Sequence, residues 1–190
     1  AFGDLGVDLA RAILANDRLS ADLDGLAPEH GGRATVCGLT LHSTEVSGAT
    51  IHLAEDVPLP LRDLPILASL PPDADGARFK EAIALVARTR AGGCIKVSGQ
   101  GAFCLSAEGV RALGRHVADA LAATPLTPER PLVLLLSENA AKAVGCYATD
   151  WGRTPAPLLV IDEIPDRAAQ FARIGRPRRG MVPISFYGLN

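Results

Sequence analysis

The sequence lacks the features that mark several common classes of protein. Its four cysteines, Cys37, Cys94, Cys104 and Cys146, have neither CxxC spacing nor the density of a disulfide framework, so we expect reduced thiols and a cytoplasmic protein. No apolar run approaches the ~20 residues that a membrane-spanning helix needs, and the longest candidate is 131–136. With 19 basic and 21 acidic residues, the net charge of -2 gives no indication of a nucleic-acid surface or an anionic membrane partner.

The length and composition are those of one globular unit. The chain has 190 residues, of which 48% are hydrophobic, and we expect residues 1–190 to form a single domain around one core. The sequence starts at Ala1 without a Met, and residues 1–15 lack the basic, apolar and cleavage regions of a signal peptide. We therefore expect a fragment of a longer protein whose upstream part is not included.

The hydrophobic pattern predicts an α/β fold. Apolar residues at spacings of three and four predict helices over 4–16 and 77–89, a helix that Ser106 begins, and a further helix over 138–147. Short apolar runs predict buried strands at 94–97, 131–136 and 158–161, and hairpins are expected over 33–53 and 170–186. Helical crossovers give parallel pairing and hairpins give antiparallel pairing, so we predict a mixed β-sheet with flanking helices. The five prolines within 57–72 predict an extended surface segment or an edge strand.

The most informative stretch is 32–67, GRATVCGLTLHSTEVSGATIHLAEDVPLPLRDLPIL. A predicted strand over 33–37 ends at Gly38, and a second one over 49–53 begins after Gly48. Between the two glycines stand the hydroxyl-bearing residues Thr40, Ser43, Thr44 and Ser47. Such a turn suits a polar ligand approached by the backbone, although an ordinary hairpin with local side-chain to backbone hydrogen bonds fits the same pattern.

This stretch resembles a known family. The arrangement RATV-x-G-xxx-HST-E-V-SG-x-TI, followed by PL-x-L-RDLPIL, is similar to the second half of the EutA family, the reactivating factors of ethanolamine ammonia-lyase. The strings PLVLLLSENAAKAVG and QFARIGRPRRGMVPISF resemble that family's last strand-helix unit and closing hairpin. The family in turn resembles the actin, Hsp70 and sugar-kinase group of ribonuclease H-like ATPases, which hold nucleotide between two halves. The resemblance implies that residues 1–190 are the C-terminal half of such a protein.

The resemblance also implies a nucleotide site. Its residues would be Gly38, Thr40, His42, Ser43, Thr44, Ser47 and Gly48, with the turn approaching adenine and ribose. Thr40 stands where the resemblance implies a second Gly, and this departure weakens the nucleotide assignment. The group's two Asp-x-Gly-x-Thr phosphate turns have no convincing copy here, because Asp4-Leu5-Gly6 follows no apolar strand. We therefore expect ATP and Mg²⁺ to be bound by the intact protein, as a weak ATPase, and no catalysis by this chain alone.

Other candidate groups favour structural interpretations. Gly99-Gln-Gly101 lacks the third Gly of a dinucleotide fingerprint, and His30, His42, His52 and Cys37 match no zinc-ligand spacing, so no metal site is predicted. His42 and Ser43 would point to opposite faces of a strand, which disfavours a hydrolase pair. Asp162 and Glu163 fit an acidic cap better than paired catalytic carboxylates. Arg173, Arg176, Arg178 and Arg179 suggest a solvated turn, or contact with an acidic partner or a phosphate.

The resemblance implies a function in ethanolamine catabolism. The intact protein would be an ATP-dependent reactivating chaperone that releases inactive cobalamin from ethanolamine ammonia-lyase, its partner, in the cytoplasm or in association with a bacterial microcompartment. We expect no nucleic-acid or membrane partner. Two alternatives stay open, which are a partner-binding module with a degenerate nucleotide site and a small-molecule kinase of the same ATPase group.

Overall fold

The structure, a computed structural model, describes residues 6–21, 43–47, 51–99, 106–166, 168–178 and 181–188. The chain divides into two compact units between Thr40 and Leu41. In the first unit, α1 (Gly6–Leu14) confirms the predicted helix over 4–16, and a short helix, α2 (Asp17–Ser20), follows it. The side chain of Asn16 begins α2 by accepting a hydrogen bond from the Arg18 amide at 3.1 Å. The predicted strand over 33–37 lies outside the described residues.

In the second unit, the described residues form eight strands of one mixed sheet. They are β1 (Ser43–Ser47), β2 (His52–Leu53), β3 (Leu61–Leu70), β4 (Gly93–Val97), β5 (Leu132–Leu136), β6 (Leu158–Ile161), β7 (Phe171–Ile174) and β8 (Val182–Tyr187). Their order in the sheet is β1-β8-β7-β3-β4-β5-β6-β2. Strands β3 to β6 run parallel and the other pairings are antiparallel, which confirms the predicted mixed α/β fold.

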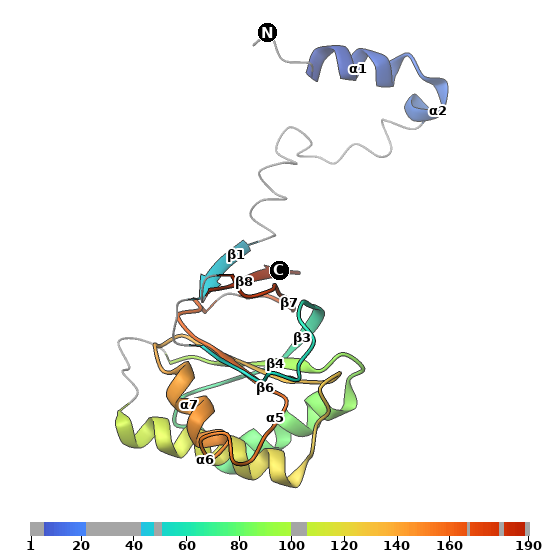
Figure 1. The fold of residues 1–190 in the computed structure, drawn as a ribbon. Helices are drawn as coiled ribbons and strands as arrows, with labels where there is room; N and C mark the ends of the chain where they lie inside the picture. The colour runs from blue at the N-terminus through green and yellow to red at the C-terminus, as the bar shows by residue number, and fades with distance from the viewer. Residues whose placement is uncertain are drawn as a thin grey trace. The chain divides into compact units, whose positions relative to one another are not determined.

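Three helices connect the parallel strands and lie together on one face of the sheet (Figure 1). They are α5 (Gly76–Arg88), α6 (Ala107–Ala123) and α7 (Ala141–Ala148). Asp75 begins α5 by accepting a hydrogen bond from the Arg78 amide at 2.9 Å, and Ser106 begins α6 by accepting one from Gly109 at 3.1 Å. All three helices were predicted, although α7 begins at Ala141 and not at Glu138. Among the described helices none combines the length and apolarity needed to span a bilayer.

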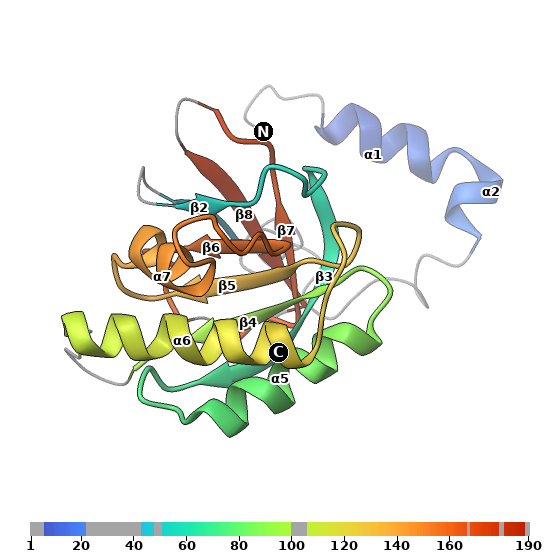
Figure 2. The same cartoon turned by 60° about the horizontal axis from the view of Figure 1, so that its bottom comes forward.

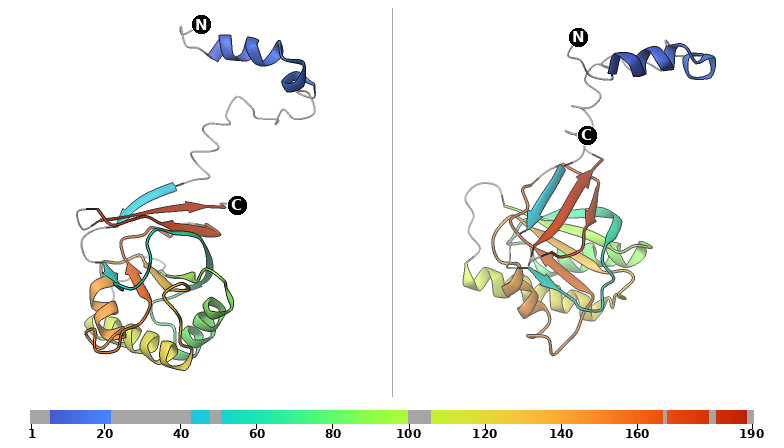
Figure 3. Two further views of the ribbon diagram at one scale, coloured as in Figure 1. Left: turned by 45° about the vertical axis from the view of Figure 1, so that its right-hand side comes forward. Right: turned by 45° about the horizontal axis from the view of Figure 1, so that its top comes forward.

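The sheet curls over itself. Strands β1 and β2 stand at opposite ends of the strand order, yet Ser47 and His52 are close neighbours in sequence. Five residues of extended chain span at most roughly 18 Å, whereas the outer strands of a flat eight-stranded sheet lie roughly 34 Å apart. The sheet therefore cannot be flat. Figure 3 shows β7, β8 and β1 on the side of the parallel strands opposite the helices.

This curl gives the unit two apolar cores that share β4, β5 and β6. On the helical side, Ile95 and Leu134 pack with Phe79 of α5 and Leu113 of α6. On the other side, Cys94, Val133, Leu135, Leu159 and Ile161 pack with Ala172, Ile174, Val182, Ile184 and Phe186 from β7 and β8. In Figure 2 the strands β4, β5 and β6 lie side by side in the middle of this arrangement. Both faces of these strands are buried, which explains their continuous apolar sequences.

Strand β3 corrects one prediction. The proline-rich segment was expected at the surface or at a sheet edge, but β3 pairs with β7 on one side and with β4 on the other. Pro65 is tolerated because the strand is irregular around it, with register shifts between Leu61 and Leu64 and between Ile66 and Ala68. Asp63, within the first irregularity, has a left-handed φ of 54°. Pro65 lies opposite Phe171 of β7, and the parallel pairing with β4 starts only at the next residue, Ile66.

Candidate functional site

The predicted nucleotide turn is only partly described. Gly38, Thr40, His42 and Gly48 lie outside the described residues, whereas Ser43, Thr44 and Ser47 belong to β1. This strand pairs antiparallel with β8, with Ser43 opposite Phe186 and Ser47 opposite Val182. A continuous turn between the two glycines was therefore the wrong conformation for this stretch. A role of these seven residues in nucleotide binding stays a prediction.

The first strand of the hairpin expected over 33–53, residues 33–37, lies outside the described residues, so that pairing stays a prediction. Strand β2 pairs with β6, where His52 lies opposite Val160, and β1 pairs with β8. The two segments therefore occupy opposite ends of the sheet order and do not pair with each other. Both described strands therefore pair with strands that are distant in the sequence. By contrast, the hairpin expected over 170–186 is confirmed, with Phe171 opposite Tyr187.

A buried lysine lies near the carboxyl end of β4. The Lys96 side chain is 8% exposed, and its Nζ lies 3.6 Å from Oδ1 of Asp166. Ser98, just beyond β4, donates its hydroxyl to Oδ2 of Asp166 at 3.0 Å. Lys96 and Asp166 line a shallow groove of about 500 Å³ beside β3. Ligands of α/β sheets commonly bind at this edge, but an anion here would have to compete with Asp166 for the lysine.

The two carboxylates after β6, Asp162 and Glu163, accept hydrogen bonds from residues at or just before the start of α7. Asp162 is fully buried, and its Oδ2 accepts a hydrogen bond of 3.0 Å from the Ala141 amide at the start of α7. Glu163, with a left-handed φ of 58°, accepts one from the Asn139 side chain at 3.1 Å. Asp162 therefore satisfies a free amide at a helix N-terminus, as expected of a carboxylate there. This is a structural role, in agreement with the preference for an acidic cap over a catalytic pair.

Two glycines allow helix α7 to pack closely against α6 and β2. A Cβ on Gly114 of α6 would come within 3.1 Å of the Val144 carbonyl oxygen, and one on Gly145 would overlap the His52 ring. The absence of these carbons lets the three elements approach closely. Burial lowers the pKa of His52, so its imidazole packs here in the neutral form at pH 7. The position of α7 in turn fixes the connection that follows it, residues 149–157.

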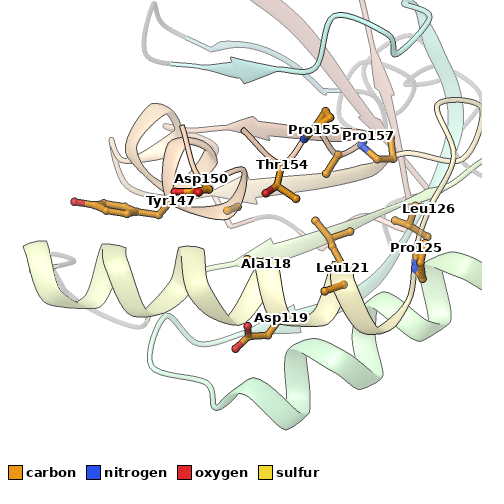
Figure 4. A pocket seen from close by; sticks show the side chains of 13 residues that line it. Ala118, Asp119, Leu121, Pro125, Leu126, Tyr147, Asp150, Thr154, Pro155 and Pro157 are labelled. Carbon is orange, nitrogen blue, oxygen red and sulfur yellow. The ribbon is translucent and has the colours of Figure 1, made fainter. Parts of the chain in front are cut away.

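This connection and α6 enclose a cavity of about 310 Å³ (Figure 4). Leu121 and Ala118 of α6 face Thr154 and Pro155 across it, and further apolar residues, among them Leu126, complete the lining. The lining contains neither lysine nor arginine. The cavity is therefore suited to an apolar group and not to a triphosphate, which requires positive charge.

The connection begins with a strained turn. Asp150, Trp151 and Gly152 have φ values of 47°, 58° and 83°, so three successive residues are left-handed. The turn is fixed by hydrogen bonds from the Trp151 amide to the Cys146 carbonyl at 2.7 Å and from the Gly152 amide to the Thr149 carbonyl at 3.0 Å. Trp151 is nevertheless 67% exposed. Left-handed backbone costs energy at residues other than glycine and occurs preferentially at functional sites.

The thiols differ in their surroundings. Cys94 is buried, which raises its pKa to about 12 although the nearby Lys96 charge acts in the opposite direction. Cys146 is half-buried, and both thiols are free. Cys37, Cys104, His30 and His42 lie outside the described residues. Within the described ranges no three His, Cys, Asp or Glu residues are grouped as a metal would require.

Comparison with known proteins identifies the family. A model of the ethanolamine utilisation protein EutA matches residues 1–189. The chain belongs to the EutA family. It is 30% identical over 191 residues to the ethanolamine ammonia-lyase reactivase EutA of Escherichia coli (strain K12) and 31% identical over 207 residues to that of Salmonella typhimurium (strain LT2). Each alignment covers 99% of this chain and 40% of the relative, so the chain spans about two fifths of their length. No solved structure matches the chain.

In this EutA-family chain, reasoning from sequence missed two features of the site. The pairing of Lys96 with Asp166 joins two segments far apart in the sequence, and no motif indicates it. The exposed Trp151 has only one sequence signal, the Gly152 that follows it and takes a left-handed conformation. The basic turn was anticipated at the surface, and there the Arg176 side chain donates to the Leu59 carbonyl at 3.3 Å.

Proposed function

We propose that the intact protein is a reactivating factor of ethanolamine ammonia-lyase and that residues 1–190 form its C-terminal part. The observation that carries this proposal is the match of the EutA family model to residues 1–189. The two relatives that align with 99% of the chain are both named for reactivation of this lyase. The lyase is then the partner, and the protein acts in the cytoplasm or in association with a bacterial microcompartment.

The proposed activity is release of inactive cobalamin from the lyase, driven by ATP. A two-state protein can drive such a release only if it binds the lyase differently in its two states. In an actin-like or Hsp70-like protein, nucleotide would select the state by changing the angle between two halves. The mixed sheet with helices on one face supports the proposal that this chain is one such half.

The described residues alone do not fit a complete site for ATP and Mg²⁺. Ser43, Thr44 and Ser47 lie in a paired strand, and the buried Lys96 already faces Asp166. The cavity of about 310 Å³ beside α6 has neither lysine nor arginine in its lining. We therefore derive no step through the nucleotide from these residues. In our proposal the intact protein binds ATP and Mg²⁺, and its remaining length supplies the phosphate contacts.

A second candidate is a partner-binding module with a degenerate nucleotide site. The observation that favours it is the β1 strand, which replaces part of the expected nucleotide turn. In this alternative the chain contributes a surface for the lyase, and the intact protein works without hydrolysis. The two candidates share the partner and differ in their need for ATP.

Reactivation of the lyase tests both. Ethanolamine ammonia-lyase inactivated with cyanocobalamin is mixed with the full-length protein, Mg²⁺, adenosylcobalamin and either ATP or a non-hydrolysable analogue. We expect activity to return with ATP only. Recovery with both nucleotides would favour the binding module, and no recovery with either would overturn the reactivating function. Phosphorylation of ethanolamine in the same mixture would support the small-molecule kinase instead.

A further inference from the structure

Trp151 combines exposure with a costly backbone conformation. Its side chain is 67% exposed, and its φ of 58° follows another left-handed residue, Asp150. A tryptophan in solvent contributes little burial of apolar surface, so the fold of this unit gains little from it in the free protein. The turn is nevertheless held by its own hydrogen bonds and by an ion pair of 2.8 Å between Asp150 and Arg153. The molecule thus presents an indole ring to solvent on a fixed backbone.

A second aromatic ring supports the indole. The Tyr147 ring meets Trp151 edge-on, with centroids 5.8 Å apart and planes inclined by 73°. The Tyr147 hydroxyl accepts a hydrogen bond from Nε of Arg111 on α6 at 3.2 Å. Trp, Tyr and Arg are the residue types that most often carry the energy of protein–protein contacts, and rings that are already positioned lose little entropy on binding.

A hollow of about 320 Å³ lies beside the indole. Its lining is Asn139, Ala140, Lys142, Ala143, Cys146 and Trp151. Most of this surface is apolar, and Lys142 is the one charged residue among the lining residues. The Asn139 amide is already held by Glu163. A hollow of this kind fits an apolar side chain, while the exposed ammonium group of Lys142 favours a carboxylate next to it.

We propose that Trp151, Tyr147 and this hollow, together the Trp151 platform, dock an acidic segment of ethanolamine ammonia-lyase. An apolar side chain of that segment enters the hollow against the indole, and a neighbouring carboxylate pairs with Lys142. Arg111, at the Tyr147 hydroxyl, adds positive charge to the same face. The inference rests on the proposed function, because that function supplies the lyase as the partner.

The test uses the full-length protein and measures its dissociation constant for the lyase by calorimetry. The decisive variant is Trp151→Gly, because glycine adopts a left-handed φ without strain and the turn is preserved. Leu85→Ala is the matched control, since Leu85 is 43% exposed on α5 and lies outside the platform. We expect Trp151→Gly to raise the dissociation constant at least about tenfold and Leu85→Ala to leave it within about twofold. Circular dichroism and the melting temperature verify that both variants are folded.

Charge reversal tests the chemistry of the partner. Lys142→Glu should raise the dissociation constant by about fivefold or more at low salt, and the difference should shrink as ionic strength rises. Unchanged affinity in this variant would overturn the acidic partner, and unchanged affinity in Trp151→Gly would overturn the platform. If the unaltered protein reactivates the lyase while Trp151→Gly does so equally well and binds equally tightly, the inference fails alone. If the unaltered protein neither binds nor reactivates the lyase, the proposed function fails and the inference with it.

Discussion

Gly145 of α7 lies so close to the imidazole of His52 in β2 that a Cβ at this glycine would overlap the ring. The helix and the short edge strand therefore contact each other through a glycine. His52 also lines a cavity of about 500 Å³ together with Thr149 and Gly152, and Gly152 belongs to the strained turn. The packing of one glycine thus affects both the sheet edge and the turn that presents Trp151.

We expect Gly145→Ala to destabilise the protein by about 1–3 kcal/mol, because an added methyl group overpacks a tight contact. The sign of this stability change is informative, because Gly→Ala in an exposed helix would stabilise the protein by up to about 1 kcal/mol. Urea unfolding of the single variants and of the double variant with His52→Ala measures the coupling. The double variant should recover about 1 kcal/mol relative to the sum of the single changes, and strict additivity would contradict the proposed contact.

The second core makes a separate prediction. Phe186 of β8 is 1% exposed and packs among Val133, Leu135 and Ile161, so Phe186→Ala should lower the free energy of unfolding by about 3–5 kcal/mol. Phe171 in the partner strand is 36% exposed, and its replacement by Ala should cost about 1 kcal/mol, including its stacking on Tyr187. Equal losses in the two variants would mean that the hairpin does not cover the parallel strands.

The two described thiols should react at very different rates. Cys146 is half-buried, whereas Cys94 is fully buried with a pKa raised to about 12 by that burial. Iodoacetamide at neutral pH, followed by peptide mass spectrometry, should therefore modify Cys146 first and Cys94 only after denaturant is added. Fast modification of Cys94 in the folded protein would contradict its place in the second core.

Tyr187 should lose its proton only at high pH. Burial and the hydrogen bond of 2.6 Å that its hydroxyl donates to Asp63 raise its pKa to about 12. A folded-state pKa above the unfolded value gives stability that is complete below about pH 10 and is lost as the pH rises to about 12. NMR of tyrosines labelled at the ring carbon follows the titration, and Tyr187→Phe assigns the signal. Asp63→Asn should lower the pKa of Tyr187, and an unchanged titration would exclude the bond.

The elements predicted correctly are those whose evidence is local. Phe79, Ile83 and Val86 lie on one face of α5 at helical spacing, and the apolar run 131–136 predicted the buried strand that is observed as β5. The pairing partner of a strand, in contrast, cannot be read from the residues of that strand. Strand β1 pairs with β8 and not with the segment that follows it, and β3 crosses the middle of the sheet despite Pro65. Of the five prolines within 57–72 only Pro58 is exposed, and Pro72 is buried.

The candidate site was less predictable than the fold. Glycines and hydroxyl groups drew attention to residues 38–48, of which the structure describes only 43–47, as a strand. The features that shape the Trp151 platform depend on tertiary packing, because Gly114 and Gly145 set the position of α7 and the turn follows from it. The sequence around a single glycine in a helix does not indicate which other element packs against it. The left-handed φ of Trp151 likewise has no signal in the residue itself.

The pairing of β1 with β8 has a consequence for biosynthesis. During synthesis β1 and β2 emerge from the ribosome well before their partners, β8 and β6, are made. Until then both strands carry unsatisfied backbone amides and carbonyls, which are prone to wrong association. Long-range pairing of this kind also slows folding. The arrival of the closing hairpin therefore sets how long the nascent chain stays vulnerable to aggregation and dependent on protection by chaperones.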